Sequence, residues 1–439
     1  MDLPLYGINI RTAGARGDGS GDESPVFARE LAKSPALVTI PPGVYALDRP
    51  LRVPSGCRII AHPQARIKIA DGAEWGVRDA LVTNADWETG NSRIEIVGGT
   101  WDGNCPNVRR AAEDERTGYT GNLMIFRNVE HLVLKDLKLT DPASYFVALG
   151  KVRKFRVESI RFEILHHTRN QDGIHVSGHC EDGYINDITG YGEYCPGDDL
   201  VALNADDALD RSETRSCLAG PIRRITVTNL RAEDCHAFMR FATVWSTIED
   251  VVVRNLYGGC VDTAINADAL RFCRSPLFAQ DDPAFARGCG HLRNIHFSGL
   301  HIWKTRDLKS GLFQFHSRME NVVVENFTRV MERDANPLQP SFDLRYIPGA
   351  TGRISGLSGE DVAAVRSAPE DAPLQWESVD AFGPARQTSA FALGPQGYLT
   401  GNTHHLGRLE VASTPLHPLP KPDWNKGMTV DLQSVKGKG

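Results

Sequence analysis

HLVLKDLKL at residues 131–139 carries an apolar side chain at almost every second position and turns at a Lys-Asp pair. Three later stretches repeat this pattern: KFRVESIRF (154–162), RRITVTNL (223–230) and EDVVVRNL (249–256). Neighbouring side chains of a strand point to opposite faces, so this alternation places the apolar residues on one buried face. The four stretches therefore predict strands that share one core.

The interval between these motifs indicates how the strands are arranged. The apolar residue that closes each motif recurs at positions 137, 160, 188, 230, 256, 300, 327 and 357, at intervals of 23 to 44 residues. Repeats of short strands at such a period are typical of a solenoid, in which stacked coils share a core that no coil could bury alone. The leucine-rich repeat is the rival at this period, but its Leu-rich consensus is missing.

We therefore expect an all-β fold, a single-stranded right-handed parallel β-helix. Residues 1–385 would form the catalytic β-helix domain and residues 386–439 a C-terminal extension or tail. An exposed end coil presents unpaired strand edges, so both ends need a cover. SPVFARELAKS (24–34) predicts a short amphipathic helix over the N-terminal end, and the last fifty or so residues predict a C-terminal cover and a loose tail.

Composition excludes several functional classes. Lys and Arg total 49 against 55 Asp and Glu, a net charge of −6, so no basic excess exists for binding nucleic acid. The sequence has no run of eighteen apolar residues, so no membrane span is expected. Nine cysteines without a CxxC pair favour reduced thiols over disulfides or zinc. We expect a cytoplasmic protein, or a secreted or periplasmic one whose leader has been removed; the oligomeric state is not predicted.

Three carboxylates on consecutive coils suggest hydrolysis of a glycosidic bond. Asp172 falls in one predicted coil, and Asp198 and Asp199 in the next. One carboxylic acid can protonate the leaving oxygen while another activates water, roughly 6.5–9.5 Å away in an inverting enzyme. Adjacent coils lie about 4.8 Å apart, and such close carboxylates raise the pKa of at least one member. An Asp at a strand start is also a common turn former, which is the alternative for each residue taken singly.

Several stretches resemble the pectin-active β-helix superfamily. GARGDGSGDESPVFARELA (14–32) looks like its opening, and GGTWDGN (98–104) is similar to the first coil of the polygalacturonases, glycoside hydrolase family 28. NQDGIHVSG (170–178), CPGDDLVALN (195–204) and CHAFMRFA (235–242) follow in that family's order, and the resemblance covers about residues 10–330.

The resemblance implies a role for each matching residue. Asp198 would be the general acid, Asp172 and Asp199 would hold the water, and His236 would tune the acid by hydrogen bonding. Cys235 and Ala237 replace the glycines that flank this histidine in the family.

The family's Arg-Ile-Lys element, which grips a uronate carboxylate, is missing from AINADAL (264–270). Arg240, and less strongly Arg271, could replace its charge. If neither does, the sugar in the cleaving site would be neutral.

Further candidates surround these positions. Asn170, His166, His167, Trp245 and Trp303 are predicted to bind substrate, and Trp101 is another candidate platform for sugar stacking. Core packing is the alternative for each tryptophan. Parity places His175 on the strand face opposite Asp172, as a structural or rim residue. The acidic loop at 206–210 is interpreted as solvated rather than as a calcium site, and we expect no metal and no cofactor.

These observations predict an inverting glycoside hydrolase that cleaves a pectin-type or related plant or microbial polysaccharide. Long insertions after Asn204 and Asp268 could wall the groove into a pocket, which favours exo-action. The alternatives are a polysaccharide lyase or epimerase on the same scaffold, and a non-catalytic glycan-binding β-helix. The expected partner is a carbohydrate substrate.

Overall fold

The computed structural model describes residues 6–112, 115, 117–207, 209, 211–244, 246–268, 290–308, 310–315, 317–336 and 341–345, and five short strands beyond them. The chain divides into two units, residues 1–203 with 208–238 and residues 204–207 with 239–439. Each unit is described by itself. The predicted domain boundary between 385 and 386 stays a prediction, because most of the residues around it lie outside the described ranges.

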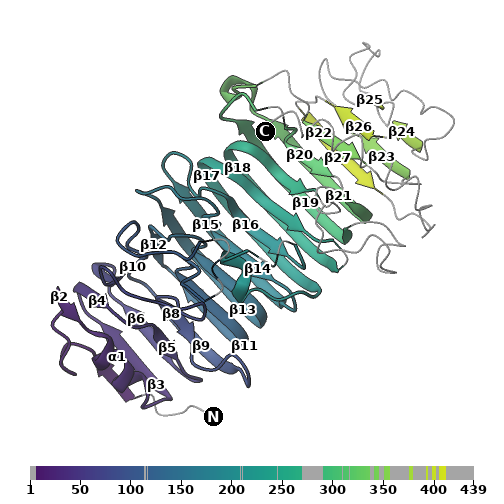
Figure 1. The fold of residues 1–439 in the computed structure, drawn as a ribbon. Coiled ribbons are helices and arrows are strands. Elements are labelled where there is room, and N and C mark those ends of the chain that lie inside the picture. Colours follow the sequence, from purple (N-terminus) through teal and green to yellow (C-terminus); the bar gives the residue numbers. More distant parts are fainter. Residues whose placement is uncertain are drawn as a thin grey trace. The chain divides into compact units, whose positions relative to one another are not determined.

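The first unit is built almost entirely from parallel strands (Figure 1). Its strands are β1 (Tyr6–Asn9), β2 (Asp18–Asp22), β3 (Ala36–Ile40), β4 (Gly43–Leu47), β5 (Leu51–Val53), β6 (Arg58–Ala61), β7 (Ala65–Ile69), β8 (Val82–Asn84), β9 (Asn91–Val97), β10 (Thr100–Asp102), β11 (Met124–Lys135), β12 (Lys138–Thr140), β13 (Val147–Glu163), β14 (Ile174–Ser177) and β15 (Glu181–Tyr191). The unit boundary falls within the next two strands, β16 (Asp199–Asn204) and β17 (Ile222–Ala242).

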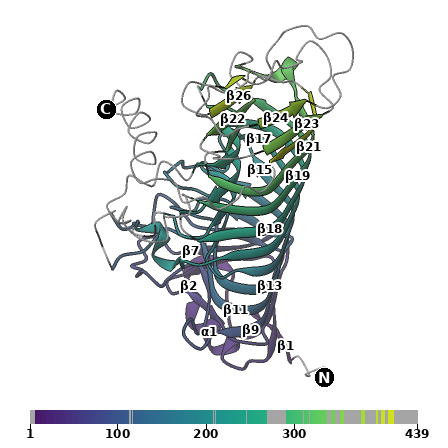
Figure 2. The same cartoon turned by 90° about the vertical axis from the view of Figure 1, so that its right-hand side faces the viewer.

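The predicted apolar alternation forms the core of this stack. Figure 2 shows β9, β11 and β13 in succession, and β15 and β17 continue the parallel pairing. Leu134, Val157, Ile185 and Val227 occupy one register position on four consecutive coils, and each is buried. A coil thus buries its apolar face on the coils before and after it, which confirms the β-helix prediction.

The turn inside each repeat is formed by a polar residue in the left-handed region. Asp136, Ser159, Asp187 and Asn229 have φ angles of 56°, 54°, 55° and 56°. Asp and Asn tolerate this conformation better than other non-glycine residues because their short side chains bond the local backbone. The recurring Asn/Asp/Ser of the sequence motif is therefore the residue that turns the chain at the same place in these four coils.

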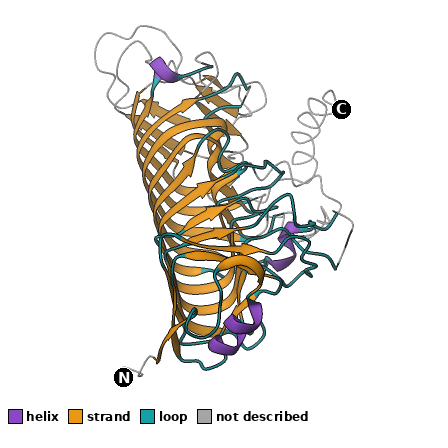
Figure 3. Cartoon of the chain, turned by 90° about the vertical axis from the view of Figure 1, so that its left-hand side faces the viewer, coloured by secondary structure: helices purple, strands orange, loops and turns teal. Residues whose placement is uncertain are grey.

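The predicted N-terminal helix is present and contacts the first strands. Helix α1 (Ser24–Leu31) begins with a proline in its first turn and buries Phe27 and Leu31. Phe27 packs edge-on against Tyr45 of β4, with the ring centroids 5.9 Å apart. Figure 3 shows this helix beside the N-terminal strands. This placement confirms the helical part of the predicted N-terminal cover.

The second unit also contains stacked parallel strands. They are β18 (Thr247–Ala267), β19 (His291–Lys304), β20 (Phe313–Phe315), β21 (Arg318–Arg329) and β22 (Phe342–Arg345). Phe313 and Phe342 stack across neighbouring coils with ring centroids 4.4 Å apart. The remaining strands are β23 (Thr351–Ser355), β24 (Gln375–Ser378), β25 (Ala392–Leu393), β26 (Tyr398–Gly401) and β27 (His405–Val411).

The described C-terminal strands reverse the chain direction. Strand β27 pairs antiparallel with β21 and β23, and β26 pairs antiparallel with β22 and β25. These pairings cover hydrogen-bonding edges of the second unit. They agree with the predicted C-terminal cover as far as residue 411; the tail predicted after it lies outside the described residues.

Two compositional expectations can be compared with the described residues. The seven described cysteines form no disulfide, and six of them are buried. A helix long and apolar enough to span a bilayer does not occur in the described ranges.

Candidate active site

Three of the predicted catalytic side chains meet in the first unit. One ligand atom from each of Asp198, Asp199 and His236 lies within 4.8 Å of the other two. Asp199 begins β16, Asp198 immediately precedes it, and His236 belongs to β17. The His236 amide N–H donates to the carbonyl oxygen of Pro196 at 3.4 Å, which fastens the two segments together. The sequence prediction grouped these three residues, and the structure brings them together.

Asp198 and His236 form the solvent-accessible part of this cluster. Their side chains are 28% and 29% exposed, and Nδ1 of His236 lies 3.3 Å from Oδ1 of Asp198. The Tyr194 ring meets the His236 ring edge-on, with the centroids 6.0 Å apart, and the His167 ring centroid lies 5.8 Å from that of Tyr194. Asp198 can therefore reach a ligand while His236 contacts its carboxylate, and the exposed His167 lies at the rim.

Asp172 lies deeper, at the turn that precedes β14. Its backbone carbonyl accepts the Phe146 N–H at 2.8 Å, and the next N–H, from Gly173, donates to the carbonyl of Asp199 at 2.8 Å. Gly173 is required at this approach, because a Cβ there would lie 2.5 Å from the Leu200 carbonyl oxygen. The Asp172 and Asp199 segments are thereby held on adjacent coils.

Burial raises the pKa of Asp172 well above its usual range, and the negative charges of Asp198 and Glu213 raise it further. His236 and Arg211 act in the opposite direction. The side chain of Asp172 is 5% exposed, so its charged form loses most of its hydration. Asp172 is therefore the carboxyl of this cluster for which the structure favours the protonated form.

The parity argument placed His175 on the wrong face, although its burial agrees with the structural role that was one of its two predicted roles. Its Nδ1 lies 2.6 Å from Oδ2 of Asp172, although parity placed the two side chains on opposite faces. The parity argument fails because strand β14 begins only at Ile174, so Asp172 still belongs to the turn. The contact joins two buried side chains, and no sequence pattern indicated it.

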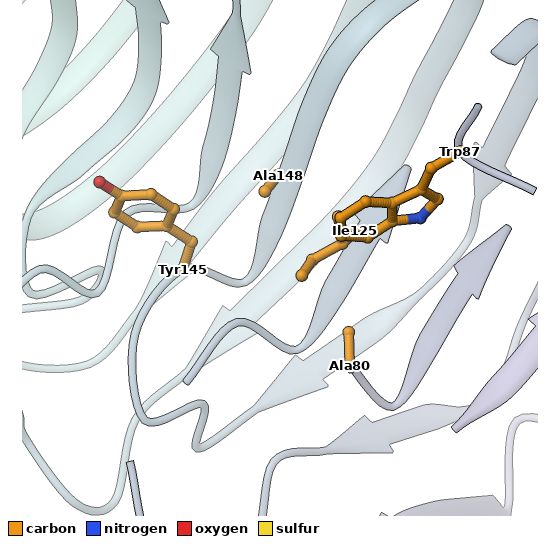
Figure 4. Close-up of a cluster of buried hydrophobic side chains, with 5 residues drawn as sticks. All are labelled: Ala80, Trp87, Ile125, Tyr145 and Ala148. Carbon is orange, nitrogen blue, oxygen red and sulfur yellow. The ribbon is translucent and has the colours of Figure 1, made fainter. Parts of the chain in front are cut away.

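Tyr145 forms the wall behind this pair. Its ring stacks on His175 with a centroid distance of 4.2 Å and an interplanar angle of 8°. Burial, followed by the charge of Asp172, raises the pKa of the Tyr145 hydroxyl well above its usual value. Figure 4 shows the hydroxyl pointing away from Trp87, with which Tyr145 shares a buried cluster that also contains Ile125. The stack therefore ties His175 to the core.

The buried carboxylate of Glu213, which pairs with Arg110, contributes negative charge near Asp172. Nη2 of Arg110 lies 2.6 Å from Oε2 of Glu213, the first residue of the 3-10 helix η1 (Glu213–Ser216). Burial alone would raise the pKa of Glu213, but a hydrogen bond from its own backbone and the charge of Arg110 hold it below its usual value. The sequence analysis missed both residues because they lie 103 positions apart.

Two predicted substrate-binding residues lie on the loop before Asp172. Asn170 is half-buried in a left-handed turn, and its carbonyl accepts a hydrogen bond from the Ser144 hydroxyl at 3.0 Å. The exposed His166 pairs through Nδ1 with the Asp141 carboxylate at 3.2 Å. Both residues therefore have a structural role already, and their contact with substrate stays a prediction.

The remaining predicted binding residues belong to the second unit or lie outside the described residues. Arg240 is buried, with Nη2 3.7 Å from Oδ2 of the equally buried Asp207. Trp303 is 3% exposed, and the Arg333 guanidinium lies over its ring, 3.7 Å from the centroid. The Trp303 ring is thus covered by protein. Trp245 and Arg271 lie outside the described residues.

Two other interpretations need correction. Trp101 is fully buried and donates its indole N–H to the Gly98 carbonyl at 3.0 Å, so it is a core residue and not a sugar platform. Asp206, interpreted as part of a solvated loop, is 1% exposed and accepts the N–H groups of Val244 and Ser246. Hydrogen bonds from two backbone N–H groups replace the hydration that the Asp206 carboxylate loses on burial.

The cluster of Asp198, Asp199 and His236 permits two kinds of chemistry. Two carboxylates and an imidazole can transfer protons to and from a bound substrate. The same oxygen and nitrogen atoms could also hold a divalent cation. The absence of a cofactor stays a prediction. Of the two kinds of chemistry, acid–base catalysis is the one that needs only the side chains of this chain.

Comparisons with curated proteins find phage and plant relatives. The pre-neck appendage protein of Bacillus phage B103 is 34% identical over 106 residues, 24% of this chain and 12% of that protein. A polygalacturonase of Persea americana is 22% identical over 249 residues, 52% of this chain and 49% of that protein. The chain thus matches half or less of the length of these relatives.

Solved structures support the fold. The Yersinia enterocolitica family 28 exopolygalacturonase superposes with a TM-score of 0.57 at 14% identity, covering 89% of this chain and 78% of that one. The Thermotoga maritima exopolygalacturonase gives 0.50 at 15% identity, covering 74% and 90%. At these identities the likeness establishes a shared parallel β-helix fold.

A family model matches residues 7–261, more than half of the 439 residues, and this range contains Asp172, Asp198, Asp199 and His236. The match and the polygalacturonase relative confirm the resemblance to the pectin-lyase-like superfamily. The chain belongs to the family described as rhamnogalacturonase A/epimerase, pectate lyase-like.

Proposed function

We propose that this protein is a glycoside hydrolase acting on a pectin-type polysaccharide. The observation that carries the proposal is the convergence of Asp198, Asp199 and His236 within 4.8 Å, with the Asp198 carboxylate accessible to solvent. Glycoside hydrolysis needs one carboxylic acid and one carboxylate beside the scissile bond. The family membership and the polygalacturonase relative support the pectin-type substrate class.

In the proposed mechanism, Asp198 protonates the leaving oxygen. Asp198 is the most exposed carboxylate of the group. Its contact with His236 holds the carboxylate in position, and a proton can pass between the two side chains. Asp199 and Asp172 would hold the attacking water. The raised pKa of Asp172 favours its protonated form. Asp199 is therefore the better candidate for the ionised base that activates the water.

The separation of the carboxylates bears on the stereochemical outcome. One oxygen of Asp198 lies within 4.8 Å of one oxygen of Asp199, whereas the roughly 6.5–9.5 Å of an inverting pair and the roughly 5–5.5 Å of a retaining pair are distances between the two carboxyl groups. The inverting assignment therefore rests on the resemblance to family 28. Proton NMR of the first-formed product anomer distinguishes the two outcomes.

The sequence offers one strong candidate for a cation that grips a uronate carboxylate, and this residue belongs to the second unit. Arg240, the strongest candidate to grip a uronate carboxylate, has Asp207 3.7 Å away and is itself buried. This pairing favours a neutral sugar over a uronate at the point of cleavage. Exo-action, suggested by the long insertions, is part of the same proposal, and a uniform small product at early time points would support it.

The test is reducing-end release from a panel of pectic and neutral plant oligosaccharides. Asp198→Asn removes the proposed acid and should lower turnover by about 10²- to 10⁴-fold. The matched control is Asp182→Asn, an exposed aspartate paired with Arg224 on the same unit. Equal activity of the Asp198→Asn variant and the control would overturn the proposal.

A second candidate is a non-catalytic glycan-binding β-helix. It is favoured by the burial of Asp172 and Asp199, which are 4% and 8% exposed, and by the likeness to phage appendage proteins. Binding of an oligosaccharide from the panel without any new reducing ends would select this candidate.

A further inference from the structure

A groove lies on the first unit, and none of the four proposed catalytic residues lines it. This flank groove has a volume of about 570 Å³ and crosses β10, β12, β13, β15 and β17. Its polar lining includes Thr100, Lys138, Arg161, Thr189, Tyr191 and Arg231. Neither the proposed hydrolysis nor the family match assigns a function to it.

The basic side chains of the flank groove form a straight row. Lys138 pairs in register with Arg161, Arg161 with Thr189, and Thr189 with Arg231. Since paired strands lie about 4.8 Å apart, Lys138 and Arg161 are one coil apart and Arg161 and Arg231 are two coils apart. The three cations are exposed and repeat along the direction in which the coils stack.

A second row of side chains runs beside the basic row, at the turn of each of these coils. Asp136, Ser159 and Asp187 line the same groove, and all three have left-handed backbone conformations. Acceptor side chains thus line the groove two residues before Lys138, Arg161 and Thr189. Lys138 is partly neutralised by Glu163, 2.6 Å away, which leaves Arg161 and Arg231 as the stronger charges of the basic row.

An aromatic ring lies beside the basic row. Tyr191 is 50% exposed, and the Arg161 guanidinium lies 5.6 Å from its ring centroid. An exposed ring offers a stacking surface for the apolar face of a sugar, while paired Asp and Arg side chains bind hydroxyls and carboxylates. A flexible acidic peptide would satisfy the arginines, but would leave the aspartate row facing like charges.

We propose that the flank groove binds a stretch of acidic polysaccharide, with its chain along the stacking direction of the coils. Carboxylates of the glycan face Arg161 and Arg231, its hydroxyls face Asp136 and Asp187, and one sugar ring packs on Tyr191. The groove would hold the polymer independently of bond cleavage, so this inference does not rest on the hydrolytic role of Asp198.

The test measures binding by calorimetry in an Asp198→Asn background, so that the ligand stays intact. The ligands are a polygalacturonate oligosaccharide, a neutral glycan of equal length, a sulfated glycan and polyglutamate. Exposed charge contacts contribute about 0.2–1 kcal/mol each, so Arg161→Gln/Arg231→Gln should weaken polygalacturonate binding by roughly two- to thirtyfold. The matched control, Arg78→Gln/Arg153→Gln, removes two exposed arginines elsewhere on the unit and should bind as before.

A second variant keeps the test decisive if the double variant does not fold. Thr189→Asp places a negative charge between Arg161 and Arg231 and should also weaken binding of the carboxylated glycan. Unchanged affinity in a folded groove variant, or an equal loss in the control, would overturn the proposal. Binding of the neutral glycan, the sulfated glycan or polyglutamate as tight as that of polygalacturonate would overturn its assignment to carboxylated sugars.

Discussion

Oδ2 of Asp172 lies 2.6 Å from Nδ1 of His175, and both side chains are at most 5% exposed. The carboxyl stands in a turn and the imidazole in β14, held from behind by the stacked ring of Tyr145. A hydrogen bond between these two buried groups satisfies polar atoms that cannot reach water. The pair therefore connects the proposed site to the stability of the fold.

The first prediction concerns stability against pH. The folded-state pKa of Asp172 is raised above the usual 3.8, so the folded protein binds more protons there than the unfolded chain. This contribution is complete below the unfolded pKa and is lost as pH rises through the folded pKa. Asp172→Asn removes it, so melting temperatures should show the wild type losing stability relative to the variant as pH increases.

Asp182→Asn is the control of opposite sign. The hydrogen bond from Arg224 lowers the pKa of Asp182, so its contribution is present above the usual pKa and is lost as pH falls. A parallel pH dependence of the wild type and the Asp172→Asn variant would contradict the first prediction.

The second prediction concerns the pH profile of activity. The charge of His236 lowers the pKa of Asp172, so His236→Gln should allow that pKa to rise further. Because the proposed mechanism uses Asp172 in its protonated form, the alkaline limb of kcat/KM should move to higher pH in this variant. His62→Gln, at an exposed position, is the control; an alkaline limb that stays in place in both variants refutes the link.

The third prediction concerns the shared core. Ile185 packs in register between Val157 and Val227 and is fully buried. Ile185→Ala leaves a cavity in the stack and should cost about 2–5 kcal/mol, while Ile185→Val should cost about 0.5–1.5 kcal/mol. Chemical denaturation followed by circular dichroism measures the difference, and equal midpoints for the two variants would rule out a continuous core at this coil.

The fourth prediction concerns the buried ion pair. Arg110→Ala leaves the Glu213 carboxylate buried without its cation and should destabilise the fold by about 3–5 kcal/mol. Arg110→Ala/Glu213→Gln removes the orphaned charge and should recover part of that loss. A double variant no more stable than Arg110→Ala would show that the charge of Glu213 is not the cause.

The fold could be predicted from the sequence because each coil repeats the same local rules. Alternation around Leu134 and Val157 fixed the buried face, and the Asp or Asn at the turn fixed where the chain bends. The proximity of Asp198 and His236 was also predictable, since family motifs and one-coil spacing agreed. Their catalytic roles stay predictions.

The parts of the site that the sequence did not predict depend on tertiary packing. His175 was misplaced because Gly173 ends the turn that holds Asp172, and alternation applies only after it. Arg110 and Glu213 belong to loops that no period governs. Asp206 carries a charge and was interpreted as solvated, but backbone N–H groups that cannot be read from the sequence satisfy it.

The reversed direction of β27 along β21 has a consequence for self-association. A stack of parallel coils that ends in an unpaired strand edge can pair with a strand of a second molecule in the same way as with its own strands. Such a stack could therefore grow into a fibre. Strand β27 pairs with β21 on one side and with β23 on the other, so β27 presents no free edge to a second molecule. The edge of β21 that could accept a neighbour is thus occupied by a strand of its own chain.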